Sequence, residues 1–159
     1  MKPRLPTTAL EVIGALLLIE AAVSTPAAGQ ATISAPTAAG VWQQVDDAGK
    51  VGAWVTISEE QGAYVGRLSR LFLDPDDDPN PICRECPGEK HNEPLLGLVF
   101  IERMKQTGFD YGGGTILDPE SGKVYGASMH LSPDGTKLTV HGYLGLSIFG
   151  RSQTWNRVE

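Results

Sequence analysis

The stretch from residue 112 to residue 158 decides the fold, and it reads GGGTILDPESGKVYGASMHLSPDGTKLTVHGYLGLSIFGRSQTWNRV. Residues 123–131 and 137–144 within it alternate between apolar and more polar side chains, which is typical of half-buried β-strands. Ser132-Pro133-Asp134-Gly135 separates them, with a Pro suited to the first corner of a turn and a Gly that tolerates positive φ. The stretch therefore predicts consecutive antiparallel strands joined by tight turns.

The apolar sides of these two segments must share one face of the sheet, because only then do both reach the core. These sides comprise Tyr125, Ala127, Met129 and Leu131 in the first segment and Leu138, Val140, Gly142 and Leu144 in the second. A three-residue loop would pair Ser132 with Thr136 and mix the faces. An even-length loop sets Met129 opposite Leu138 or Val140, and we predict such a loop.

Similar turn sequences recur along the chain and separate runs of strand length. We expect eight strands, at residues 41–45, 51–58, 63–72, 96–104, 109–117, 123–131, 136–144 and 148–158. The run at 96–104 would also suit two helical turns, but Gly97, Val99 and Ile101 favour a strand. Eight short strands must protect their edges, which closure into a barrel does completely. The prediction is an all-β chain with a single antiparallel, about eight-stranded up-and-down barrel, and a two-sheet β-sandwich is the alternative.

The N-terminal residues follow the order of a secretory signal, with Lys2 and Arg4, an apolar run and then small residues. The apolar run is too short to span a bilayer, which takes about 20 residues. We expect residues 1–31 to be a cleaved signal peptide, residues 32–39 a flexible leader, and residues 40–159 the barrel domain. The protein is then exported, periplasmic or secreted, with no stable membrane span after cleavage.

Two acidic residues, Glu11 and Glu20, flank the apolar run. They leave a membrane anchor or a disordered tail as alternatives. The chain has 19 acidic against 13 basic side chains, a net charge of −6, and no basic stripe. This balance argues against nucleic acid as a partner.

The loop at residues 74–94 contains both cysteines, Cys83 and Cys86. In an exported protein we expect them to form a local disulfide, worth about 2 kcal/mol for so small a ring. Thiol-redox catalysis would favour a Cys at a helix N-terminus, which the prolines of this loop oppose. Zinc would need four ligands, and only His91 and nearby glutamates could join the cysteines.

Two further patterns have simpler interpretations. Asp76, Asp78 and Asn80 resemble the start of a calcium loop, but the positions that follow do not fit, and a solvated acidic loop is the better interpretation. The run of glycines at 112–114 precedes no helix and is therefore not a phosphate loop. We expect a strand that bends there or lets another backbone approach closely.

Candidates for acid–base chemistry are His91, His130 and His141, and none lies in a nucleophile motif. His130 and His141 fall on the polar side of their strands and not opposite one another. We expect no enzyme, no metal and no cofactor, with thiol-redox or hydrolytic activity as the alternative.

Several motifs together resemble the bacterial exported family known as domain of unknown function 2147. They are Gly40-Val41-Trp42, Cys83-x-x-Cys86, residues 113–125, Gly142-Tyr143-x-Gly145 and the closing GRSQTWNR at 150–157. The resemblance covers about residues 40–158. It implies a small exported β-barrel-like domain and supplies no activity, ligand or catalytic residue.

Gly40-Val41-Trp42 also resembles the G-x-W that opens the barrels of lipocalins, in which an Arg from the last strand lies over that Trp. The resemblance implies that Arg151 or Arg157 lies over Trp42, in a cation–π contact worth about 0.5–2 kcal/mol. Trp42, Arg151, Trp155 and Arg157 are therefore candidates for barrel closure or ligand contact, and packing is the simpler role.

Two functions remain, and they differ in what fills the barrel. In the first, the barrel is a non-catalytic binding module for a small apolar or amphipathic ligand, for which eight strands leave room. In the alternative, a filled barrel acts as an envelope protein-interaction or self-association module. The candidates for its interior are Tyr125, Met129, Leu138 and Val140, with Leu131 and Leu144 as further bulky residues and Ala127, Gly142 and Gly114 as small ones. A cavity of about 300 Å³ or more would favour the ligand.

Overall fold

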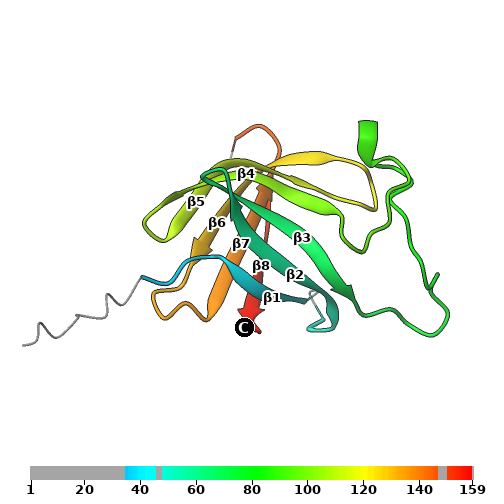
Figure 1. The fold of residues 1–159 in the computed structure, drawn as a ribbon, viewed down its shortest axis with the longest axis horizontal. Coiled ribbons are helices and arrows are strands. Elements are labelled where there is room, and N and C mark those ends of the chain that lie inside the picture. The colour runs from blue at the N-terminus through cyan, green and yellow to red at the C-terminus, as the bar shows by residue number, and fades with distance from the viewer. Residues whose placement is uncertain (1–34, 46–47, 147–149, 159) are drawn as a thin grey trace, which may run out of the picture. The chain divides into compact units, whose positions relative to one another are not determined.

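The computed structural model describes residues 35–45, 48–146 and 150–158, and eight antiparallel strands in these ranges form a closed barrel (Figure 1). The strands are β1 (Gly40–Val45), β2 (Val51–Glu60), β3 (Ala63–Leu71), β4 (Val99–Thr107), β5 (Asp110–Leu117), β6 (Val124–Leu131), β7 (Lys137–Tyr143) and β8 (Gly150–Arg157). Each pairs with its sequence neighbour, and β8 pairs with β1 through Trp42 and Arg157. The predicted up-and-down barrel is confirmed, and the sandwich is not needed.

The β6–β7 hairpin has the predicted even-length loop. Met129 lies opposite Val140, and the Ser132 amide donates to the Lys137 carbonyl at 2.9 Å. Gly135 takes φ of 71° and its amide donates to the Ser132 carbonyl at 2.8 Å, which closes the turn. The apolar alternation that selected this loop therefore also sets the register.

Leu144 departs from the expected inward pattern of β7. The strand ends at Tyr143, and the Leu144 side chain is 61% exposed. Leu144 therefore lies beyond the end of β7, where it lines the mouth of the barrel and is not packed in the core.

Strand β4 covers residues 99–107 instead of the predicted 96–104. Gly97 takes φ of 94° and still belongs to the preceding loop, while residues 105–107 pair with β5. Arg103 takes φ of 60°, and the register between β3 and β4 shifts on either side of Gly66. These β-bulges bend the strand, and pairing with its neighbours extends it beyond the predicted end.

The glycine run at 112–114 is the second place where a strand bends. The register between β5 and β6 shifts between Tyr111 and Gly114, and Gly113 takes φ of 72°. A Cβ at Gly114 would collide with the Met104 side chain and the Glu102 backbone. The predicted bend and close approach are confirmed, but Gly114 leaves no free space in the barrel, because Met104 occupies it.

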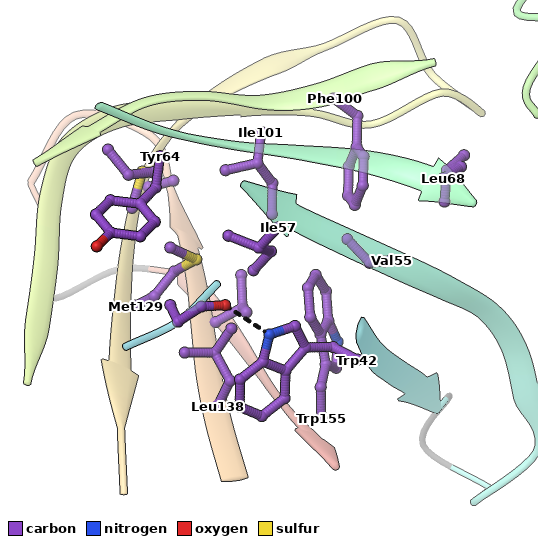
Figure 2. Close-up of a cluster of buried hydrophobic side chains, with 14 of the residues drawn as sticks. Trp42, Val55, Ile57, Tyr64, Leu68, Phe100, Ile101, Met129, Leu138 and Trp155 are labelled. Atoms are coloured by element: carbon purple, nitrogen blue, oxygen red, sulfur yellow. Dashed lines mark hydrogen bonds between the residues drawn. The ribbon is translucent and has the colours of Figure 1, made fainter. Parts of the chain in front are cut away.

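The core lies inside the barrel and draws side chains from all eight strands (Figure 2). Its largest fully buried members are Trp42, Trp155, Tyr111, Ile57, Leu98 and Ile101. Among the residues that the structure describes, no helix has the length and apolar content to cross a membrane.

The predicted signal peptide, residues 1–31, lies outside the described residues, as does the start of the predicted leader. The last residues of the predicted leader differ from the expected flexible segment. Ala38 is fully buried in the core, and the backbone at residues 37–39 accepts hydrogen bonds from barrel side chains. This segment is therefore part of the barrel domain.

Candidate functional site

One end of the barrel is closed around Trp42. The indole Nε1 donates to the Ala38 carbonyl at 2.8 Å, drawn as a dashed line in Figure 2. The Arg157 guanidinium lies over the indole, with Cζ 4.2 Å from the ring centroid. Of the two candidate arginines, Arg157 is thus the one that covers Trp42, and Arg151 lies elsewhere.

Arg157 also ties three backbone segments together at this end. Its Nη2 donates to Thr37 at 2.6 Å, its Nη1 to Ala39 at 2.8 Å, and its Nε to Gly135 at 2.5 Å. Burial lowers the pKa of Arg157 from its ordinary value, and an arginine stays protonated at any ordinary pH. The charged side chain therefore joins residues 37–39, which cross this end of the barrel, to the β6–β7 turn.

Tyr111 completes the closed end. Its hydroxyl accepts a hydrogen bond from the Ala38 amide at 2.8 Å, and its ring meets Tyr64 edge to face with centroids 4.9 Å apart. Burial raises the pKa of both phenols. This end of the barrel is thus filled by side chains and crossed by a hydrogen-bonded segment.

The opposite end is open and leads into a cavity of about 1050 Å³. Its apolar lining includes Leu68, Leu71, Leu95, Phe100, Ile116, Leu117, Val140 and Trp155. Phe100 and Trp155 lie with ring centroids 6.3 Å apart. The barrel is therefore filled in one half and hollow in the other.

The cavity has one polar wall, formed by β1 and β8. Gln153 Oε1 accepts hydrogen bonds from Trp155 Nε1 at 3.2 Å and from Gln44 Nε2 at 3.3 Å. Arg151, also on β8, lines the cavity nearer the mouth, and its side chain is exposed. From the closed end to the mouth, the side chains on the inward face of β8 are therefore Arg157, Trp155, Gln153 and Arg151.

Acidic side chains surround part of the mouth. Asp77, Asp78, Asp118 and Glu120 line it. Asp77 Oδ2 accepts from the Asp74 amide at 2.7 Å, and Asp78 Oδ1 accepts from the Asn80 amide at 3.0 Å. The acidic stretch noted in the sequence thus shapes an exposed loop at the mouth.

The cysteine loop borders this mouth and is drawn in green between β3 and β4 in Figure 1. Cys83 and Cys86 form the predicted disulfide, with Cα atoms 5.3 Å apart. The Cys83 amide donates a hydrogen bond to the Glu93 carbonyl at 2.8 Å, and the Asn92 amide donates to the Cys83 carbonyl at 2.9 Å. The loop also lies close to the β5–β6 turn, because a Cβ at Gly122 would collide with the Glu85 backbone. The disulfide stabilises a loop that is packed against the β5–β6 turn.

The structure divides the predicted site residues between the two ends. Trp42 and Arg157 lie at the closed end, whereas Trp155 and Arg151 line the cavity. The predicted interior residues divide in the same way: Tyr125 and Val140 line the cavity, while Met129 and Leu138 are buried without lining it.

Sequence reasoning missed Gln44, Gln153, Leu68 and Phe100 in the cavity wall. The two glutamines carried a usable signal, because alternation from Trp42 and from Trp155 places them on the inward faces of their strands. Leu68 and Phe100 lie beside register shifts, where counting along a strand fails.

The histidines lie outside this cavity in the described structure. His130 Nδ1 is 2.6 Å from Asp110 Oδ1, and His141 Nδ1 is 2.8 Å from Ser152 Oγ. His130 pairs with Thr139 and His141 with Ser128, so the two are not opposite one another, as predicted. Neither His91 nor the cysteines are among the residues lining the cavity.

Residues 40–157 match the model of the family described as uncharacterized protein conserved in bacteria, DUF2147. The chain belongs to this family. A solved structure from Helicobacter pylori, of a protein described as belonging to the lipocalin family, is similar with a TM-score of 0.66 and 20% identity over 78% of this chain and 84% of that one. This likeness concerns the fold. None of the curated proteins compared with the chain is a significant match.

Proposed function

We propose that this domain is an exported, non-catalytic binding module for a small apolar or amphipathic ligand, which it holds in the open-end cavity. The observation that carries the proposal is the cavity of about 1050 Å³. Ligand sites in proteins are concave, mostly apolar and about 300–1,000 Å³. In the described part of the chain, the barrel is filled at one end, and a ligand enters the largely apolar cavity through the mouth at the other.

Two further observations support the proposal. The Cys83–Cys86 disulfide is typical of proteins that work in an oxidising compartment, which supports a periplasmic or secreted location. The solved structure described as a lipocalin shares the barrel architecture. The alternative, a filled barrel that binds an envelope protein or itself, requires an occupied interior, and the cavity weighs against it.

The proposal is tested with the neutral apolar fluorophore N-phenyl-1-naphthylamine. We expect its fluorescence to rise saturably with the wild-type protein. Leu71→Trp places an indole in the cavity and should weaken binding at least about tenfold, since the probe loses its contacts there. Thr56 lies between Val55 and Ile57, which point inward, so its own side chain is on the outer face of β2. Thr56→Trp therefore adds the same indole outside the cavity and should bind the probe like the wild type.

Circular dichroism melts establish that each variant is folded. Absence of binding by the folded wild type would contradict the proposal, and so would equal binding by all three proteins.

A further inference from the structure

The polar wall of the cavity has a hydrogen-bonding arrangement that a purely apolar ligand would not use. Gln44 and Gln153 are the two side-chain amides in the described lining. Their orientation follows from Trp155, because an indole N–H is only a donor and must face an acceptor. Trp155 Nε1 faces Gln153 Oε1 at 3.2 Å, so the Gln153 carbonyl points toward the wall.

Gln44 is oriented by the same oxygen. Gln153 Oε1 accepts a second hydrogen bond from Gln44 Nε2 at 3.3 Å. Within the described residues, this leaves Gln153 Nε2 and Gln44 Oε1 without a hydrogen-bond partner. No described side-chain nitrogen or oxygen is both fully buried and unsatisfied, so these two atoms are accessible to solvent, and both residues line the cavity. The wall thus offers one amide donor and one carbonyl acceptor beside apolar surface.

The charges around the site favour an uncharged ligand group. Among the described residues that line the mouth, four are carboxylates and one is an arginine, Arg151. A ligand carboxylate would be repelled by this rim, and the two amides carry no charge to neutralise it. An ammonium group would be drawn to the rim and away from the glutamines. A neutral group that donates and accepts satisfies both free atoms, whereas a purely apolar ligand would shut them off from water and leave them unpaired.

We propose that Gln44 and Gln153 form a head-group subsite for an amphipathic ligand whose polar end is an uncharged carboxamide. This inference rests on the proposed function and adds the chemical class of ligand. The acyl chain lies against the apolar wall of Leu68, Phe100 and Ile116. The head group accepts from Gln153 Nε2 and donates to Gln44 Oε1.

The test compares three probes of equal chain length, decanamide, decanoate and decylamine, by isothermal titration calorimetry at pH 8. We expect the wild type to bind decanamide about tenfold more tightly than either charged probe, from two added hydrogen bonds. Gln153→Glu keeps the oxygen that accepts from Trp155 and Gln44 but replaces the free donor with a carboxylate oxygen. It should lose about tenfold for decanamide and gain for decylamine. Gln43→Glu adds the same charge on the outer face of β1 and should keep the wild-type order.

If Gln153→Glu does not fold, Gln44→Met carries the same test, because it leaves the Trp155–Gln153 bond in place. We expect it to bind decanamide about threefold to tenfold more weakly. Equal binding of the three probes to the wild type, tightest binding of decanoate, or an unchanged order in the Gln153 variant would each overturn the subsite. Absence of binding by all three probes and by the neutral fluorophore would instead contradict the proposed function.

Discussion

The two ends of this barrel are built from the same eight strands and differ in what their side chains do. At the closed end, Trp42, Arg157 and Tyr111 each bond to a backbone segment that crosses the barrel. At the open end, the cavity lining is apolar except for the wall of β1 and β8 and the acidic rim, and the loops are longer. The hydrogen-bonded cluster at the closed end, which we call the plug, consists of residues 37–39 with Trp42, Tyr111 and Arg157. The plug can supply much of the stability, which leaves the other end free to stay hollow.

The largest expected effect comes from the centre of the plug. Trp42→Ala removes a fully buried indole, its hydrogen bond to Ala38 and its contact with Arg157. We expect it to lower the free energy of unfolding by about 3–5 kcal/mol. Leu71→Ala at the open end should cost about 1 kcal/mol, because this side chain is only half-buried. Urea denaturation measures both, and equal losses would remove the distinction between the ends.

The two arginines of β8 give a matched pair. Arg157→Met should cost about 2–4 kcal/mol, because three carbonyls lose a charged donor. Arg151→Met, on the same face of the strand but exposed at the mouth, should cost less than about 1 kcal/mol. Thermal melts of the two variants decide the matter, and the reverse order would contradict the assigned roles.

The disulfide stabilises a loop at the open end. Replacing Cys83 and Cys86 together by Ser should lower stability by about 2 kcal/mol, the chain-entropy value for so small a ring. The loss should appear mainly as faster proteolysis within residues 74–94, since the plug keeps its contacts. A reducing agent should weaken the wild type and leave the double variant unchanged. Resistance of the loop in the double variant would show that its packing alone suffices.

The smallest effect concerns pH at the closed end. Asp134 accepts hydrogen bonds from the Ser132 hydroxyl and from the Thr136 amide and hydroxyl, which lowers its pKa from 3.8 to about 2. Because the folded pKa lies below the unfolded one, its contribution is fully present above pH 3.8 and is lost as the pH falls toward 2. The melting temperatures of the wild type and Asp134→Ala should therefore differ near neutral pH and converge near pH 2. A difference that persists at pH 2 would assign the effect to the turn conformation instead.

Much of the fold could be predicted because local signals agree with one another. Alternation in residues 123–144 and the Pro-Asp-Gly turn together determined the hairpin register. The bounds of β4 could not be predicted in the same way, because the bulges near Gly66 and Arg103 depend on the strands alongside. Pairing with neighbouring strands determines where such a strand begins and ends, and the sequence of one segment does not contain that information.

The candidate site was harder to predict for a related reason. Trp42, Trp155 and both arginines were recognised, but their separation into two ends follows from the register of β8 against β1 and β7. The hollow half depends on which side chains fill which space, as Met104 does at Gly114. Small inward residues therefore do not by themselves predict a cavity.

One end of the barrel is sealed, and in our proposal the other end holds a ligand. The most direct measurement is ¹⁹F NMR of the protein labelled with 5-fluorotryptophan, titrated with decanamide. The chain has three tryptophans, and only Trp155 lines the described cavity, while Trp42 lies in the plug and Trp54 packs against Phe72 and Arg70. We expect the Trp155 resonance to shift saturably while those of Trp42 and Trp54 stay in place. A shift at Trp42 with Trp155 unmoved, or no shift at any of the three, would show that decanamide does not occupy the open-end cavity.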